Sequence, residues 1–521
     1  MRLHDFFDHW AREQPDAEFA VADGRSLTWG EAATITDRLA GRLATSGCRK
    51  GDRVAVLARN APWYLLLYFA AAKAGVVLVP LNWRLAPREW AGILADAAPV
   101  ALIAGAAEVA AADEIRAELP GIPRFVAEGA PDDGAWEPLE RWLADGPATP
   151  PAVEVDDGDP LYQMYTSGTT GAPKGAVLSH RAVTANLVQL SFAIPAAAGE
   201  RALVVLPMFH AAVIPAAFLA LFRGGSAFVL DAFDPEHVVR VLDTERIAHA
   251  TFVPAILQAC LVSVADVADR KYATLRSIHY GASPVAADTL REAMAAFTCD
   301  FVQSYGMTES AQALTFLSPA DHRRALDARP DLLLSAGRAA VGTTVGVVNA
   351  AGGPVAGGAP GEIRVRGPQL MTQYWRRPDE TARALRDGWL HTGDVGRVDD
   401  EGFLYVEDRV KDMVVSGGEN VYPRVVESVL FEHPAIADAA VIGVPDPRWG
   451  EAVKAVVALR AGMRATEEEI LDFCRPRLGG FERPRSVDFL DELPRTASGK
   501  VLKRVLREPY WAGRARRVSG A

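Results

Sequence analysis

The sequence predicts an α/β protein whose large N-terminal domain contains two doubly wound subdomains and a small β-barrel, followed by a small α+β domain. Three observations support this prediction. Short apolar runs alternate with helical patterns before residue 341, short strands between Gly-rich turns fill 341–410, and a separate mixture of helices and strands follows. With 521 residues, half of them hydrophobic, the chain is long enough to form more than one core.

The first block begins with a helix whose apolar residues follow helical spacing: Leu3, Phe6, Phe7 and Trp10. Strands are expected at 53–60, 76–82 and 101–105, and helices at 63–75 and 87–97. This alternation predicts βαβ units and a parallel sheet. A stretch rich in Pro, Asp and Gly at 145–160 then leads into the second alternating block.

The uncharged segment 202–222 is long enough to resemble a membrane span. Pro207 and Pro215 interrupt it, and His210 lies between them. A strand, a loop and a buried helix are therefore expected in place of a membrane span.

The later elements change in character. Sequences such as 361–367 and 402–409 indicate antiparallel strands of a small barrel. The expected α+β domain then follows with helices at 424–432 and 466–475 and strands at 438–444, 452–459 and 485–490. The domain boundaries are therefore predicted as 1–410 and 411–521.

Composition excludes several classes of function. The net charge of −11 disfavours general binding to nucleic acid or to an anionic membrane. No Cys/His spacing typical of zinc occurs, and four scattered thiols are expected to be reduced and mostly buried: Cys48, Cys260, Cys299 and Cys474. The N-terminus has no apolar signal-peptide region, so a cytoplasmic location is expected.

The segment Thr166–Gly175 carries the strongest chemical pattern in the chain. It follows an apolar run, and its hydroxyl and glycine residues allow backbone N–H groups to converge on an anion. Lys174 adds a positive charge, which is informative because only eight of the 55 basic residues are lysines. Pro173 stands where a Walker A loop needs glycine, so this is a different phosphate-binding loop.

This decamer resembles the phosphate loop of the adenylate-forming superfamily, in particular its acyl-CoA synthetase (AMP-dependent synthetase and ligase) branch. Further motifs of that family follow in the same order and extend the resemblance over nearly the whole chain. They are Gln303–Glu309 (QSYGMTE), His391–Asp394 (HTGD), Asp408–Asp412 (DRVKD), Ser416–Asn420 (SGGEN) and Pro494–Lys500 (PRTASGK).

The individual side chains suit a nucleotide. Tyr305 offers a flat face for a base, and Glu309 offers a hard oxygen ligand for Mg²⁺. Asp394 lies in a tight turn and can accept hydrogen bonds from both ribose hydroxyls, with Arg409 as a nearby donor. Lys500 lies in a Thr-Ala-Ser-Gly loop that leaves its ammonium free to move.

The resemblance implies a ligase with ATP, Mg²⁺ and coenzyme A as cofactors or co-substrates. A carboxylate would attack the α-phosphorus to give acyl-AMP, and a thiol would then displace AMP to form a thioester. Lys500, Thr308 and His210 would be catalytic, and Thr166 and Glu309 would hold the metal. The resemblance implies this ATP site: Thr166, Ser167, Gly168, Thr169, Thr170, Gly171, Lys174, Gly281, Ala282, Ser283, Ser304, Tyr305, Gly306, Met307, Thr308, Glu309, Asp394, Arg409 and Lys500.

The resemblance also implies that the small domain is mobile. It would rotate about a hinge at Lys411 between the two half-reactions. The rotation would move Lys500 away and bring Gly417 and Gly418 to the tunnel for the thiol.

The acid is expected to be a hydrophobic monocarboxylic acid, and a fatty acid is the first choice. His210 stands where peptide synthetases carry an aspartate for the substrate ammonium, so amino acids are disfavoured. His210 would gate the pocket, although an ordinary buried histidine is the alternative. The candidate acyl pocket is His210, Ala211, Val213, Ile214, Phe252, Tyr280 and Gln303.

Several alternatives remain open. Tyr280 could shorten the pocket or favour an aryl acid, which would make the protein an aryl-acid CoA ligase. The chain has no fused carrier motif, so the thiol would belong to CoA or to a free-standing acyl carrier protein. A luciferase-type oxygenase would share the adenylation step, whereas a catalytically silent module is disfavoured. Oligomeric state is left open, and neither a nucleic-acid partner nor a membrane span is expected.

Overall fold

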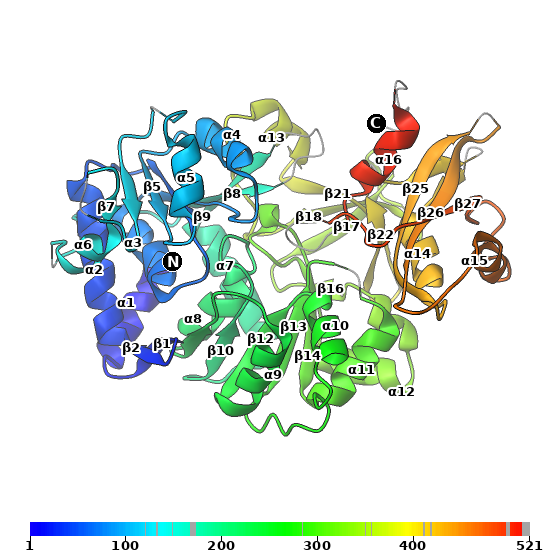
Figure 1. Cartoon of the computed structure of the whole chain (residues 1–521), viewed down its shortest axis with the longest axis horizontal. Helices are drawn as coiled ribbons and strands as arrows, with labels where there is room; N and C mark the ends of the chain where they lie inside the picture. The colour runs from blue at the N-terminus through cyan, green and yellow to red at the C-terminus, as the bar shows by residue number, and fades with distance from the viewer. Residues whose placement is uncertain are drawn as a thin grey trace.

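The computed structural model in Figure 1 arranges the chain as two α/β subdomains, a small antiparallel sheet and a C-terminal domain. The structure describes residues 1–119, 121–131, 134–147, 149–166, 173–283, 285–349, 351–355, 357–409, 412–416, 419–446, 448–495 and 501–512. At residues 408, 409, 415, 419, 420 and 450 it describes the backbone alone.

The first subdomain is built on an eight-stranded sheet in the order β19-β9-β8-β4-β3-β5-β6-β7. Its strands are β3 (Arg53–Leu57), β4 (Val77–Pro80), β5 (Ala101–Ala104), β6 (Phe125–Ala127), β7 (Glu137–Pro138), β8 (Pro160–Thr166), β9 (Lys174–Ser179) and β19 (Gln373–Tyr374). Its helices are α2 (Trp29–Thr45), α3 (Pro62–Ala74), α4 (Pro87–Ala97), α5 (Val109–Arg116) and α6 (Leu139–Ala144). The expected parallel βαβ units are confirmed, since β3 pairs in parallel with β4 and β5.

Helix α3 is apolar on every side because it is buried on every side. It packs against α2, α1 and β1 as well as β4. Its one charged residue, Lys73, lies 2.6 Å from carboxylate oxygens of both Asp8 and Asp37. These ion pairs compensate the buried ammonium, as a buried charge requires.

The second subdomain has a nine-stranded sheet in the order β16-β15-β14-β13-β12-β10-β11-β1-β2. The strands are β1 (Glu18–Ala22), β2 (Arg25–Thr28), β10 (Arg201–Val204), β11 (Ser226–Val229), β12 (Ile247–Phe252), β13 (Ser277–Gly281), β14 (Asp300–Tyr305), β15 (Thr315–Leu317) and β16 (Arg338–Ala339). The helices are α1 (Leu3–Glu13), α7 (His180–Ala193), α8 (Leu219–Phe222), α9 (Pro235–Thr244), α10 (Pro254–Ser263), α11 (Ala287–Phe297), α12 (Pro319–Asp327), the π-helix η1 (Ile214–Phe218) and the 3-10 helices η2 (Thr308–Ser310) and η3 (Pro330–Leu334).

The chain crosses between the two sheets in ways that local patterns did not reveal. Strands β1 and β2 join the second sheet, where β1 pairs in parallel with β11. Strands β8 and β9 stay in the first sheet, although they follow the 145–160 stretch that separates the two predicted blocks, and β19 returns to it from later in the chain. Segment 202–222 forms a strand, a loop and the η1–α8 helix, as expected. Among the described residues, no helix is long and apolar enough to cross a membrane.

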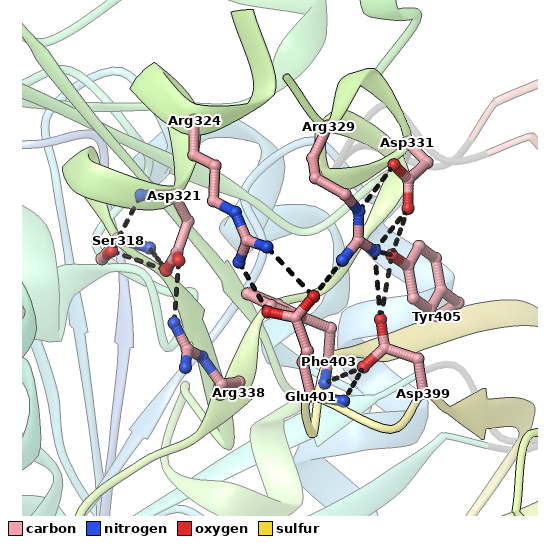
Figure 2. Close-up of polar contacts among 10 residues, drawn as sticks. All are labelled: Ser318, Asp321, Arg324, Arg329, Asp331, Arg338, Asp399, Glu401, Phe403 and Tyr405. Atoms are coloured by element: carbon pink, nitrogen blue, oxygen red, sulfur yellow. Dashed lines mark hydrogen bonds and ion pairs between the residues drawn. The ribbon is translucent and has the colours of Figure 1, made fainter. Parts of the chain in front are cut away.

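The predicted barrel region forms a five-stranded antiparallel sheet beside the second subdomain. Its elements are β17 (Thr344–Val348), β18 (Gly361–Arg366), β20 (Leu385–Arg386), β21 (Trp389–Val398) and β22 (Leu404–Arg409), with α13 (Pro378–Ala384) alongside. Figure 2 shows how the turn between β21 and β22 is attached to α12 and η3. Glu401 accepts hydrogen bonds from Arg324 at 2.6 and 3.0 Å and also pairs with Arg329. Because these groups are partly exposed, the network positions the turn and contributes modestly to stability.

The C-terminal domain confirms the predicted α+β pattern. It contains α14 (Pro423–Phe431), α15 (Glu467–Cys474), α16 (Lys503–Trp511), β23 (Val414–Ser416), β24 (Glu419–Val421), β25 (Ile436–Asp446), β26 (Gly450–Leu459) and β27 (Ser486–Phe489). Its own core includes Val426, Val441 and Val457. All four cysteines are free thiols, and burial raises the pKa of each.

Candidate functional site

The phosphate loop connects β8 to β9 as a hairpin. Thr166 ends β8 and Lys174 begins β9, and the two residues are antiparallel register partners. This strand–loop–strand arrangement differs from the strand–loop–helix of a Walker A motif, as the sequence predicted. Five predicted loop residues lie outside the described part of the chain: Ser167, Gly168, Thr169, Thr170 and Gly171.

The ammonium of Lys174 contacts one residue of β19 and one residue of α13. It forms an ion pair with Glu380 and lies 5.4 Å from the centre of the Tyr374 ring. The side chains of Lys174 and Glu380 are only 14% and 18% exposed. Sequence reasoning did not identify Glu380 or Tyr374, because nothing local links them to a loop some 200 residues earlier.

Glu309 lies on the other side of Tyr374. The tyrosine hydroxyl donates a hydrogen bond to Glu309 Oε1 at 2.7 Å, and the glutamate is 6% exposed. The remaining carboxylate oxygen of Glu309 and the hydroxyl of Thr166 are oxygen ligands that suit Mg²⁺, which usually takes only one or two protein carboxylates and also binds substrate phosphates. The described residues contain no cluster of three acidic, His or Cys ligands.

The ribose and adenine motifs meet at the ends of β14 and β21. Tyr305 Oη donates a hydrogen bond to Asp394 Oδ2 at 2.7 Å. The turn before Asp394 is held by a hydrogen bond from its backbone N–H to Thr392 Oγ1 at 3.1 Å. Arg409 is the register partner of Asp394 on β22. The structure therefore brings together three residues that lie far apart in the sequence.

Two glycines of the predicted ATP site allow close packing of the backbone beside Tyr305. A Cβ at Gly306 would lie 1.8 Å from the Gln312 carbonyl oxygen, and one at Gly281 would lie 2.4 Å from that of Ser304. Ala282 has φ of +70°, so the turn after β13 is strained for a residue with a side chain. Ser283, Met307 and Thr308 are half-buried nearby. These positions lie in the turns that follow β13 and β14.

The predicted acyl-pocket residues do not form one group. Ala211, Val213 and Ile214 pack in the core shared with α3 and α7, whereas Phe252 and Tyr280 belong to the core beneath α10–α12. The Tyr280 hydroxyl is 2.9 Å from His322 Nε2, and Gln303 is the register partner of Tyr280. The predicted acyl pocket therefore draws on side chains from two hydrophobic cores, and its assignment stays a prediction. Side chains alternate across a strand, so a shift by one residue selects the opposite face.

The other face of β13 and β14 carries a polar group that sequence reasoning missed. His279 Nε2 lies 2.8 Å from Ser304 Oγ, and Gln312 donates a hydrogen bond to the same oxygen at 2.9 Å. Val302, the register partner of His279, belongs to the same core as Val213 and Ile214. The Ser304 hydroxyl, predicted to face ATP, is thus engaged inside this group. Strand alternation was the signal that could have identified it.

His210 is half-buried, and its ring does not have a complete set of hydrogen bonds. Its Nε2 has no partner among the described residues, and its ring lies 4.3 Å from that of Phe209. Burial and the positive charge of Arg84 lower the pKa of His210 to about 4. The neutral imidazole is therefore available to a bound ligand, which disfavours the alternative of a fully satisfied core histidine.

Four predicted residues at or after the boundary of the C-terminal domain lie outside the described part of the chain: Lys411, Gly417, Gly418 and Lys500. Their surroundings are described. Arg495 and Val501 form an antiparallel bridge across the lysine loop. Asp412 pairs with Arg507 at 2.8 Å, and Arg424 donates a hydrogen bond to the Val406 carbonyl at 2.5 Å. The last contact joins the C-terminal domain to β22.

Comparison with known proteins gives matches along the whole chain. The family model for AMP-binding enzyme matches residues 7–375, and that for AMP-binding enzyme C-terminal domain matches residues 425–500. A feruloyl-CoA synthase from Amycolatopsis sp is 40% identical over 96% of this chain and 97% of its own. The fatty acid–[acyl-carrier-protein] ligase ScoC from Streptomyces coeruleorubidus is 36% identical over 98% and 96%. A fatty acyl CoA synthetase structure from Mycobacterium tuberculosis superposes with a TM-score of 0.78 at 34% identity, covering 99% of each chain.

Proposed function

Because this chain belongs to the AMP-binding enzyme family and is an AMP-forming acid–thiol ligase, we propose that it activates a hydrophobic monocarboxylic acid with ATP and transfers it to coenzyme A. Two contacts carry the proposal: Lys174 and Glu309 both contact Tyr374, and Tyr305, four residues before Glu309, donates a hydrogen bond to Asp394. The Lys174 ammonium can bind phosphates, and the buried Glu309 carboxylate can bind a hard cation. The Asp394 carboxylate can accept hydrogen bonds from ribose hydroxyls.

Each residue has a defined part in the proposed adenylation. Lys174 and the hydroxyl-rich loop hold the β- and γ-phosphates, while Thr308 contacts the α-phosphate. Glu309 and Thr166 would hold Mg²⁺, which supplies charge neutralisation to the phosphates when bound. Lys500 bridges the attacking carboxylate and the α-phosphate. As in other phosphoryl transfers, the protein accelerates the reaction by positioning and charge stabilisation.

The wall formed by Ala211, Val213 and Ile214 supports an apolar acid, and a fatty acid is the first candidate. An aryl acid with a polar ring substituent is the second candidate, and a specific observation favours it. His279 Nδ1 and Gln312 Oε1 are buried without a partner among the described residues. An unsatisfied buried polar atom costs about 1–3 kcal/mol, which a hydroxyl on the acid would offset. The likeness to a feruloyl-CoA synthase agrees with this second candidate.

The acceptor is proposed to be coenzyme A, with a free-standing acyl carrier protein as the alternative. Relatives of similar identity carry both kinds of name, a CoA synthase and an acyl-carrier-protein ligase. The motifs quoted above serve the adenylation that both reactions share, so the choice of acceptor needs a direct measurement.

The test is acid-dependent release of pyrophosphate across matched fatty and aryl acids, followed by mass spectrometry with coenzyme A and with a carrier protein. We expect pyrophosphate release with at least one hydrophobic acid and a mass increase on coenzyme A. Substitution of His279 by Phe should reduce the rate with hydroxylated aryl acids more than with alkanoic acids. If no acid caused release of pyrophosphate, the proposed function would be contradicted. If a thioester formed on the carrier protein but not on coenzyme A, the carrier protein would be the acceptor.

A further inference from the structure

We infer that Glu380 is a positioning residue of the nucleotide site, which binds the Lys174 ammonium before ATP arrives and gives way to the phosphates. This inference rests on the proposed role of Lys174 in binding ATP. It adds a residue that lies outside the recognised motifs, on α13, more than 200 positions after the phosphate loop.

The contact is held by backbone geometry on both sides. Strand β19 pairs with β9, so that Tyr374 lies opposite Ala176, and the N–H of Trp375 donates to the Gly175 carbonyl at 2.8 Å. Helix α13 starts immediately afterwards, and the N–H of Tyr374 donates to Thr381 Oγ1 at 3.0 Å. The start of β9 and the start of α13 are therefore one unit, which directs Glu380 at Lys174.

The carboxylate of Glu380 has a second cationic neighbour. Arg377 Nε lies 4.0 Å from Glu380 Oε1, while its Nη2 pairs with Asp96 Oδ1 at 2.8 Å. A continuous series of charges thus runs from Asp96 through Arg377 and Glu380 to Lys174. Because the Arg377 guanidinium also serves Asp96, the principal cation of Glu380 is Lys174.

The same ammonium cannot pair fully with Glu380 and with ATP phosphates. The Lys174–Glu380 pair is mostly buried, so its attraction is stronger than that of a surface pair. Phosphates that bind the Lys174 ammonium must replace the Glu380 carboxylate as its anionic partner. In the free enzyme, Glu380 therefore neutralises the charge of Lys174. ATP binding is weakened by the free energy needed to replace the Glu380 carboxylate with phosphate.

Removing the charge of Glu380 tests this exchange. Glu380→Gln keeps the shape of the side chain, and Asp379→Asn removes an adjacent, exposed carboxylate as a matched control. We expect Glu380→Gln to lower the Kd for ATP, measured by equilibrium dialysis without acid, and the KM for ATP, on the order of three- to tenfold each. The kcat of pyrophosphate release should change less than twofold, and ATP should raise the melting temperature of this variant more than that of the parent. Asp379→Asn should leave all these values unchanged.

A double-mutant cycle shows whether Lys174 transmits the effect. In the Lys174→Ala background, Glu380→Gln should no longer tighten ATP binding. An unchanged or weaker affinity for ATP in Glu380→Gln would overturn the inference, as would an effect that persists without Lys174. The dialysis measurement requires no acid, so it separates failure of this inference from failure of the proposed ligase activity, which is judged by pyrophosphate release in the parent enzyme.

Discussion

At the scale of single residues, Glu309 combines burial with one committed and one available carboxylate oxygen. Glu309→Gln should raise the Mg²⁺ concentration that gives half-maximal pyrophosphate release on the order of tenfold, since an amide oxygen binds a hard dication more weakly than a carboxylate. A Mg²⁺ titration of the initial rate measures this, with Glu401→Gln as a surface control. If the Mg²⁺ titration of the variant were the same as that of the parent, the metal would have to bind at other residues.

We propose, from the resemblance, that Lys500 acts at the bond being formed. Lys500→Ala should reduce acyl-AMP formation on the order of 10²–10³-fold, as loss of a charge aimed at a transition state does. It should leave thioester formation from added acyl-AMP nearly intact, because the lysine has moved away by then. Separate assays of the two half-reactions give the answer, and an equal loss in both would contradict the rotation of the small domain.

At the scale of elements, the turn that follows β14 positions several predicted ATP residues at once. Gly306→Ala would place a Cβ 1.8 Å from the backbone oxygen of Gln312, so the turn must shift and move Tyr305 and Glu309 with it. We expect kcat/KM for ATP to fall about tenfold or more, which corresponds to a displacement costing ~1.4 kcal/mol or more of transition-state binding.

The control for that substitution is Gly92→Ala on α4. A Cβ there meets nothing within 4 Å, and alanine favours a helix over glycine. This variant should keep its activity and be equally or more stable in urea. Similar activity in Gly306→Ala and the parent would show that the turn can relax without displacing the site.

At the scale of the whole molecule, we propose that the C-terminal domain adopts two orientations, one for each half-reaction. Lys411→Pro would restrict the backbone at the predicted hinge, because proline limits φ to about −65°. Acyl-AMP should then accumulate on the enzyme, and thioester production should fall by a larger factor than single-turnover pyrophosphate release. Loss of both steps to the same extent in a folded variant would contradict the hinge, as would no loss in either.

Buried neutral histidines make the whole fold sensitive to mild acid. Burial lowers the pKa of His4, His210 and His322 to about 4, and that of His180 and His279 to about 3. Their unfolded pKa is about 6.5, so below that pH the unfolded chain binds more protons and stability falls as pH falls. Each such histidine contributes ~1.4 kcal/mol per pH unit until the folded pKa is reached.

The urea midpoint should therefore decrease between pH 7 and pH 5.5. His180→Asn keeps an acceptor for the Leu3 N–H, which now donates to His180 Nδ1 at 3.1 Å, but cannot take up a proton. Its loss of stability over this pH interval should be smaller than that of the parent by about 1 kcal/mol. The exposed His9→Gln is the control, and equal losses in all three proteins would contradict the argument.

The sequence by itself determined most elements and the nature of the chemistry. Helix α3 and strands β3–β5 lie where the apolar runs predicted them, because spacing along the chain reports local structure. Lys174 was identified from the glycine- and hydroxyl-rich loop around it, whereas Glu309 and Asp394 were identified because their motifs resemble those of the adenylate-forming superfamily and follow in the same order.

Tertiary structure alone decided which distant segments meet. It joined β1 to the second sheet, gave Lys174 the Glu380 carboxylate as partner, and placed Tyr280 in a different hydrophobic core from Val213. None of these has a local signal. Pairing partners are chosen by contacts across hundreds of residues, and a strand's alternation does not say which of its faces covers which core. The polar group of His279, Ser304 and Gln312 therefore became visible only once β13 and β14 lay side by side.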